Sequence, residues 1–91
     1  MSRYRIEFDR RVEKDLRSID AEEIKRIKMA IAKLAENPRP PGCKKLRGKN
    51  NEYFRIRVGN YRIVYTVEDD ILLIVIVRVG HRQEIYDNFS G

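Results

Sequence analysis

Apolar and polar residues alternate on both sides of a Gly-Asn pair, within the stretch from Tyr53 to Tyr65. Two alternating runs separated by Gly-Asn predict a β-hairpin with a two-residue turn at residues 59–60. Counting back from that turn places Arg57 opposite Arg62. Because successive side chains point to opposite faces of a strand, one face of this hairpin is apolar. That face comprises Phe54, Ile56, Val58, Tyr61, Ile63 and Tyr65.

The other face of the predicted hairpin carries three arginines, Arg55, Arg57 and Arg62. Like charges directly opposite each other destabilise a strand pair by about 0.2–1 kcal/mol. Without an anion between them, unit charges about 5 Å apart repel by about 1–3 kcal/mol at surface-like dielectric values. Two opposed arginines do not help the protein to fold, but they suit a surface that binds phosphate. The pattern therefore predicts an anion site at Arg57 and Arg62, with Arg55 beside it.

Before the hairpin, the pattern predicts one strand and two helices. Alternation over Tyr4–Phe8 predicts the strand. Asp9 and Asp20 then have the positions of helix N-caps, each followed by apolar residues at spacings of three and four. The second helix has lysine and arginine on its outer side. We expect it to end at residues 37–38, because Pro38 disfavours the helical conformation in the residue before it.

Further strands are predicted on both sides of the hairpin. Residues 43–47 predict a short strand, and residues 48–51 a turn. The run from Ile71 to Val79 lacks alternation and predicts a strand buried on both faces. Residues 81–89 predict one or two helical turns. The chain is thus expected to have an α+β fold: an N-terminal strand, a helical hairpin, then an antiparallel meander of three to four strands. With both helices on one sheet face, the arginine face is expected to be partly open.

Composition narrows the classes of function. A chain of 91 residues predicts a single domain, 1–91. A net charge of +6 favours an anionic partner, either nucleic acid or an acidic protein segment. With one cysteine, Cys43, and one histidine, we expect no internal disulfide, no metal cluster and no cofactor. The longest apolar run is too short to span a bilayer and no signal peptide is apparent, so we expect no membrane partner and a cytoplasmic location.

Several short motifs resemble, in their order and spacing, the RelE branch of the RelE/ParE superfamily of bacterial and archaeal toxins. The resemblance extends from Tyr4 to Tyr86 and so covers nearly the whole chain. It implies the RelE-like microbial RNase fold. The motifs are Phe8-Asp9, Asn37-Pro38, Lys45-Leu46-Arg47-Gly48, the stretches 53–58 and 59–65, Arg78-Val79-Gly80-His81-Arg82 and Glu84-Ile85-Tyr86.

The resemblance implies the toxin of a type II toxin-antitoxin system. Such a toxin is an endoribonuclease, or mRNA interferase, that cuts mRNA in the ribosomal A site and inhibits translation. The implied reaction is metal-independent attack of a ribose 2′-hydroxyl on the adjacent phosphate. This reaction needs a base, cations for the phosphorane and an acid for the leaving 5′-oxygen. The implied partners are mRNA, ribosomal RNA and a small acidic or amphipathic antitoxin that forms an inactive hetero-oligomer with the toxin.

Roles for individual residues also follow from the resemblance. Arg62, with Arg57, is expected to clamp the scissile phosphate. Arg82 is expected to stabilise or protonate the leaving group, and Tyr86 to stack on a base of the codon. A further basic group is expected to bind RNA: Lys44, Lys45, Arg47 and Arg55.

The general base is the open question of this site. The RelE pattern has lysines where this chain has Arg55 and Arg57, and an arginine with a pKa above about 12 cannot take up a proton. His81 is the preferred candidate, because an unperturbed imidazole has a pKa of about 6.5. Glu52 and Glu84 are alternatives. In a third possibility no dedicated base exists, and the arginines alone lower the cost of ionising the 2′-hydroxyl.

Two other functions stay open on the sequence. One is a ParE-like toxin of the same fold that inhibits DNA gyrase and cuts no RNA. The resemblance argues against it, because that branch lacks the full set of Arg57, Arg62, Arg82 and Tyr86. The other is a catalytically weak RelE relative that only binds RNA or antitoxin, which the missing lysines favour.

Overall fold

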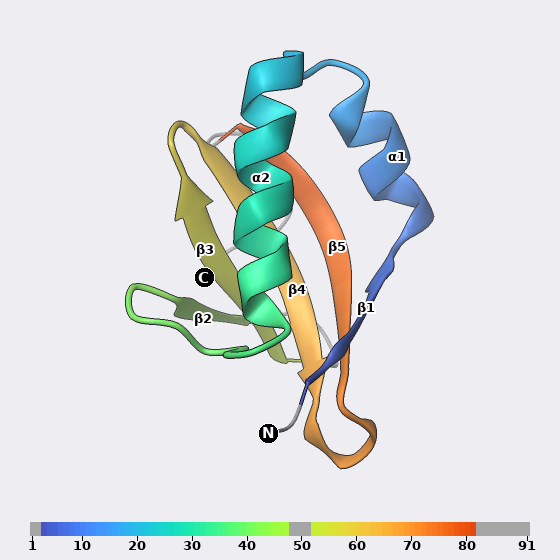
Figure 1. Ribbon diagram of the computed structural model, residues 1–91, viewed down its shortest axis with the longest axis vertical. Coiled ribbons are helices and arrows are strands. Elements are labelled where there is room, and N and C mark those ends of the chain that lie inside the picture. The colour runs from blue at the N-terminus through green and yellow to red at the C-terminus, as the bar shows by residue number, and fades with distance from the viewer. Residues whose placement is uncertain (1–2, 48–51, 82–91) are drawn as a thin grey trace.

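The computed structural model describes residues 3–47 and 52–81 (Figure 1). Its order of elements confirms the predicted α+β arrangement of a strand, two helices and an antiparallel meander. The turn predicted at residues 48–51 lies outside the described residues, as does the predicted helical tail after His81. The elements are β1 (Arg5–Phe8), α1 (Arg10–Leu16), α2 (Ala21–Leu34), β2 (Lys44–Arg47), β3 (Glu52–Val58), β4 (Tyr61–Glu68), the 3-10 turn η1 (Asp69–Ile71) and β5 (Leu73–His81).

The described strands form a five-stranded sheet in the order β1-β5-β4-β3-β2. Strands β2 to β5 pair in an antiparallel meander, as predicted. Strand β1 pairs with β5 in a parallel orientation, so the sheet is mixed. Figure 1 shows α2 lying across the sheet and α1 beside β5, on the path from β1 back to the meander. The helices thus occupy one face of the sheet.

The helices begin at the predicted caps. The Asp9 carboxylate accepts a hydrogen bond from the Arg11 backbone N–H at 2.9 Å, and this bond holds the pKa of Asp9 below its usual value. Asp20 has the N-cap position of α2, but its side chain makes no capping hydrogen bond. The predicted end of α2 was too late, since the helix stops at Leu34. Pro38 has no N–H to donate to the Leu34 carbonyl, and the Ala35 carbonyl accepts instead from the Tyr4 N–H, just before β1, at 2.8 Å.

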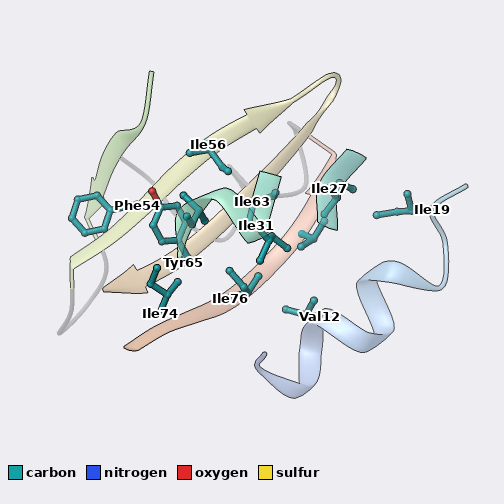
Figure 2. Packing of buried hydrophobic residues seen from close by; sticks show 12 residues of the cluster. Val12, Ile19, Ile27, Ile31, Phe54, Ile56, Ile63, Tyr65, Ile74 and Ile76 are labelled. Atoms are coloured by element: carbon teal, nitrogen blue, oxygen red, sulfur yellow. The ribbon is translucent and has the colours of Figure 1, made fainter. Parts of the chain in front are cut away.

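The core lies between the helices and the sheet. Figure 2 shows Ile27 and Ile31 of α2 pointing toward Ile63 and Ile76 of the sheet, with Val12 of α1 beside them. These side chains are buried, as the apolar stripes predicted. Neither described helix has the length and apolarity needed to cross a membrane.

Strand β5 is buried on both faces along much of its length, as its unbroken apolar run predicted. Its pairing with β4 contains a register shift at Val64 and Tyr65, where Val77 of β5 is left without a directly paired residue. Such a bulge reverses the face to which the following side chains of the bulged strand point. The bulge therefore determines the sheet face on which each side chain of β5 after Val77 lies.

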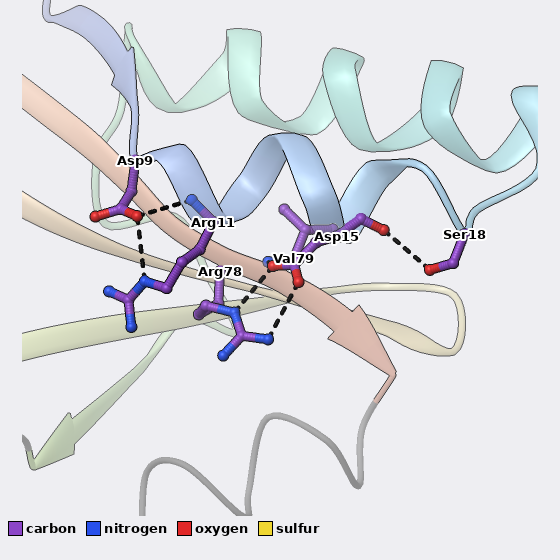
Figure 3. Close-up of polar contacts among 6 residues, drawn as sticks. All are labelled: Asp9, Arg11, Asp15, Ser18, Arg78 and Val79. Carbon is purple, nitrogen blue, oxygen red and sulfur yellow. Dashed lines mark hydrogen bonds and ion pairs between the residues drawn. The ribbon is translucent and has the colours of Figure 1, made fainter.

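One carboxylate joins α1 to the second half of β5 (Figure 3). Asp15 accepts hydrogen bonds from Arg78 Nε at 2.9 Å, Arg78 Nη2 at 3.1 Å and the Val79 backbone N–H at 3.0 Å. Strand β1 pairs with β5 only as far as Ile76. Asp15 thus accepts the hydrogen bond of the Val79 N–H, just beyond the point where the pairing with β1 ends. It fixes the part of β5 that leads to His81.

Candidate active site

The hairpin of β3 and β4 has the predicted register. Arg57 pairs with Arg62, and Val58 pairs with Tyr61 next to the turn. Gly59 has a φ of 59°, a conformation that the first position of a two-residue hairpin turn requires and that glycine adopts without strain. The turn therefore places two like charges directly opposite each other, as the sequence predicted.

A second pair of like charges lies beside the first. Lys44 of β2 is paired with Arg55 of β3, and the alternation of β3 places this pair on the same face as Arg57 and Arg62. Lys45 is separate from this group, because its ammonium forms an ion pair with Glu52 at 2.8 Å on the other face. The four cations on one face of β2, β3 and β4, which we call the arginine face, are Lys44, Arg55, Arg57 and Arg62.

The arginine face was expected to be partly open, and only one of its three arginines is exposed. Arg55 is only 3% exposed and Arg62 only 5%, while Arg57 is exposed. A second apolar cluster lies on this face, formed by Leu46 and Val64, with Tyr53 packed against it, and Arg55 is paired with Val64. Arginine carries an apolar stem that packs well against such side chains. The side chains of Arg55 and Arg62 are therefore largely withdrawn from solvent.

These buried guanidinium groups are incompletely satisfied. Arg62 Nη1 donates to the Tyr61 carbonyl oxygen at 3.1 Å. Arg62 Nε, Arg55 Nε and Arg55 Nη1 are buried and have no hydrogen-bond partner among residues 3–47 and 52–81. A buried donor without a partner costs about 1–3 kcal/mol, and more when the group is charged. An oxyanion on this face would accept from these donors, and arginine is well shaped for bidentate contact with phosphate.

The structure does not bring His81 to the arginine face. His81 is paired with Tyr61, and their rings meet edge to face with centroids 5.5 Å apart. Tyr61 packs against the core on the helix side of the sheet, whereas Arg62 points to the other side. His81 instead lines a small pocket of about 210 Å³ that Asp15 also lines. The bulge at Val77 causes this, because unbroken alternation from Ile76 would have put His81 with the arginines.

The remaining predicted site residues are placed as follows. Glu52 lies on the helix side, in its ion pair with Lys45. Arg47 ends β2, and its side chain is not among those described. The predicted residues Arg82, Glu84 and Tyr86 lie outside the described residues.

Sequence reasoning assigned no role to Tyr53, an aromatic residue on the arginine face. It is half-buried next to Leu46 and Val64. Simple alternation from Arg55 would have placed it there, so the signal for its position was present in the sequence.

Comparison with known proteins gives consistent matches. The family model described as ParE toxin of type II toxin-antitoxin system, parDE, matches residues 6–86. Toxin RelE3 of Methanocaldococcus jannaschii is 42% identical over 80 residues, which cover 84% of this chain and 88% of that protein. The mRNA interferase toxin RelE of Escherichia coli is 31% identical over 86 residues, which cover 91% and 90%.

Among solved structures, the archaeal RelE-RelB complex from Pyrococcus horikoshii OT3 has a similar chain. The TM-score is 0.76 and the sequence identity 28%, and the match covers 87% of this chain and 94% of that one. The order of the helices and the mixed sheet is thus shared with solved toxins, over nearly the full length of both chains.

Proposed function

The chain belongs to the RelE/ParE superfamily of type II toxins, and from this membership we propose that it is a ribosome-dependent mRNA endoribonuclease. The observation that carries the proposal is the pair of Arg57 and Arg62, opposed across the hairpin beside buried guanidinium donors without partners among the described residues. The name of the E. coli relative, mRNA interferase toxin RelE, supports the same activity. As such a toxin it works on ribosomes in the cytoplasm.

In the proposed reaction, the arginine face binds the scissile phosphate. The 2′-oxygen of the preceding ribose forms a bond to phosphorus while the bond from phosphorus to the 5′-oxygen breaks. One product ends in a 2′,3′-cyclic phosphate and the other begins with a 5′-hydroxyl. Arg57 and Arg62 stabilise the extra negative charge of the phosphorane. We assign protonation of the leaving 5′-oxygen to Arg82 and stacking on a codon base to Tyr86, both by family resemblance.

For the general base, the geometry favours the third possibility over His81. No carboxylate or imidazole is paired directly with Arg55, Arg57 or Arg62 in the described sheet. We therefore propose that the arginine face itself lowers the cost of ionising the 2′-hydroxyl, whose proton passes to water. On this proposal His81→Gln leaves the pH dependence of cleavage near pH 6–7 unchanged.

Primer extension on a translated message, with purified ribosomes and this protein, tests the activity. We expect breaks within A-site codons, abolished by Arg62→Ala together with Arg82→Ala. Intact message under these conditions would overturn the proposal. Because the matching family model is described as a ParE toxin, the same protein is assayed for gyrase-trapped DNA breaks. Such breaks without mRNA cleavage would establish the gyrase-inhibiting alternative.

We also propose that a cognate antitoxin neutralises the protein, as in the RelE-RelB complexes formed by its structural relatives. The groove between α1 and α2 has a volume of about 390 Å³ and could bind an apolar surface of that partner. It is lined by Val12, Leu16, Ile27 and Ile31, with Phe8 half-exposed at its margin. An amphipathic helix binds such a groove through its apolar face.

A further inference from the structure

A second hollow adjoins the arginine face and has no role in the reaction described above. It has a volume of about 250 Å³ and lies between the second half of α2, the loop before β2 and the end of β3. Most of the side chains around it are apolar: Ala30, Leu34, Pro40, Pro41 and Ile56. Cavities that hold drug-sized ligands measure about 300–1,000 Å³, so this one suits a smaller planar group.

Two cations stand at the hollow, Lys33 from α2 and Arg57 from β3. Within the described part of the chain, neither side chain has a hydrogen bond or an ion pair, and no acidic residue lines the hollow. The site thus combines an apolar slot with two uncompensated positive charges. The ligand that matches both properties is a nucleotide, with its base in the slot and its phosphate between the cations.

The loop that forms one wall is firmly anchored. Arg39 forms two hydrogen bonds to the Asp69 carboxylate, at 2.9 and 3.2 Å, and its guanidinium lies 5.2 Å from the centre of the Phe54 ring. The buried Tyr65 hydroxyl donates to the Pro38 carbonyl oxygen at 2.8 Å. Pyrrolidine rings also fix the backbone at Pro40 and Pro41. The wall is therefore formed before any ligand arrives, which reduces the entropy lost on binding.

Arg57 connects the hollow to the arginine face. Strand β2 is paired with β3 only as far as Arg55, because the chain turns away at Gly42, whose φ is 88°. The edge of β3 at Ile56 and Arg57 therefore lies beyond the end of β2. Because Arg57 both pairs with Arg62 and lines the hollow, an RNA strand bound at this arginine pair lies next to the hollow.

We propose that this hollow is a nucleotide subsite that receives the base adjoining the scissile phosphate, with Lys33 binding that nucleotide's own phosphate. The proposal rests on the proposed function, since it concerns the same RNA strand. It makes Lys33 and Ala30 determinants of RNA affinity and of codon preference, although neither belongs to the arginine face. Base and phosphate contribute separately, because the slot is apolar and Lys33 is charged.

The test is a titration of the protein with a short 2′-O-methyl RNA, which cannot be cleaved, followed by fluorescence anisotropy at several salt concentrations. Lys33→Gln is expected to weaken binding and to reduce the slope of log affinity against log salt by about 0.7. Ala30→Leu fills the slot and is expected to weaken binding about tenfold with the slope unchanged. The matched control is Lys25→Gln, an exposed lysine on the same helix that does not line the hollow.

Thermal unfolding measures whether each variant is folded. If Ala30→Leu does not fold, the surface variant Lys33→Gln alone tests the subsite. Primer extension with the same variants then separates the two proposals. If the wild-type protein cleaves A-site codons while Lys33→Gln and Ala30→Leu keep its RNA affinity and codon pattern, the subsite is wrong and the proposed function stands. If the variants weaken antitoxin binding and leave RNA binding intact, the occupant is a protein segment and the subsite is likewise overturned. If the wild type cuts no message, the proposed function fails, and the titration alone decides the subsite.

Discussion

Arg57 faces Arg62 across β3 and β4, and the described residues provide no carboxylate to separate them. The two guanidinium groups repel each other in the free protein and so lower its stability. On the proposed function, a bound RNA phosphate relieves this repulsion, so the pair reduces stability in exchange for activity. We expect Arg57→Gln to raise the free energy of unfolding by about 0.2–1 kcal/mol. The same change is expected to lower the mRNA cleavage rate by about 10²–10³-fold. Urea unfolding and primer extension measure the two effects, and a loss of both stability and activity would contradict this account.

The carboxylate of Asp69 gives a prediction about pH. Hydrogen bonds from Arg39 and from the Tyr4 hydroxyl hold the pKa of Asp69 below its usual value. Its contribution to stability is therefore present above the unfolded pKa of about 3.9, and is lost as the pH falls through the lower folded value. We expect Asp69→Asn to lower the urea midpoint at pH 7 and to have a smaller effect at pH 3, below the unfolded pKa.

The control for this prediction is Asp70→Asn, in the same turn. Asp70 has no hydrogen bond or ion pair within the described ranges. Its replacement is expected to leave the urea midpoint unchanged at both pH values. An equal effect of the two variants would show that general charge, and not the bonds to Arg39 and Tyr4, determines the pH dependence.

For individual residues, the sequence predicted which residues pair across strands better than it predicted how buried each side chain is. Counting from the Gly59 turn was sufficient to oppose Arg57 and Arg62, because a two-residue turn fixes the register. The burial of Arg62 could not be predicted in this way, since alternation gives the face on which a side chain lies but not what covers that face. The face of His81 depends on one bulge in β5, and the unbroken apolar run of that strand carries no alternation in which a bulge can be seen.

Among the elements, α1 and β5 are joined by Asp15. Removing its carboxylate leaves the Arg78 guanidinium and the Val79 N–H without the acceptor they share. We expect Asp15→Ala to lower the free energy of unfolding by about 3 kcal/mol, the cost of breaking a largely buried ion pair. Asp15→Asn keeps one acceptor oxygen and is expected to cost less. Denaturant unfolding measures both, and equal losses would contradict a role for the bond to Val79.

The groove between α1 and α2 gives a second prediction at this scale. Phe8 is 53% exposed at the margin of the groove. We expect Phe8→Glu to weaken binding of the proposed cognate antitoxin about tenfold or more, since a charge there opposes burial of an apolar contact. Isothermal calorimetry measures the affinity. Ile71→Glu is the control, because Ile71 is 65% exposed on the turn between β4 and β5 and does not line the groove.

For the fold as a whole, the sequence predicted the helices and strands but not the parallel pairing of β1 with β5 at the edge of the sheet. Apolar periodicity predicted both helices and the hairpin strands β3 and β4, and the unbroken apolar run predicted β5, because these signals lie in the local sequence. The placement of β1 beside β5, in parallel, has no local signal in residues 5–8. The crossover through α1 and α2 leads from β1 to β2 at the opposite edge of the sheet, so β1 meets β5 only when the whole sheet is assembled.

The charge of the whole molecule predicts how its RNA affinity responds to salt. If Lys44, Arg55, Arg57, Arg62 and, at the proposed subsite, Lys33 each neutralise one phosphate, the slope of log affinity against log salt is about −3.5 for single-stranded RNA. Affinity then falls about 130-fold between about 50 and 200 mM salt. Anisotropy titrations with 2′-O-methyl RNA measure this slope. A slope near zero would mean that the net charge of +6 has no part in RNA binding.

The pairing of β1 with β5 has a consequence for the moment at which the protein becomes active during its own synthesis. Residues 5–8 leave the ribosome early, but their partners, residues 73–76, are translated after every other described element. Closing a loop of that length costs roughly 4 kcal/mol of chain entropy, which only the assembled sheet can offset. A nascent chain that lacks β5 therefore has β1 without a partner and a core without Ile74 and Ile76. The topology delays folding until translation has passed β5, so on the proposed function the ribosome that makes this protein is not exposed to an active nascent chain.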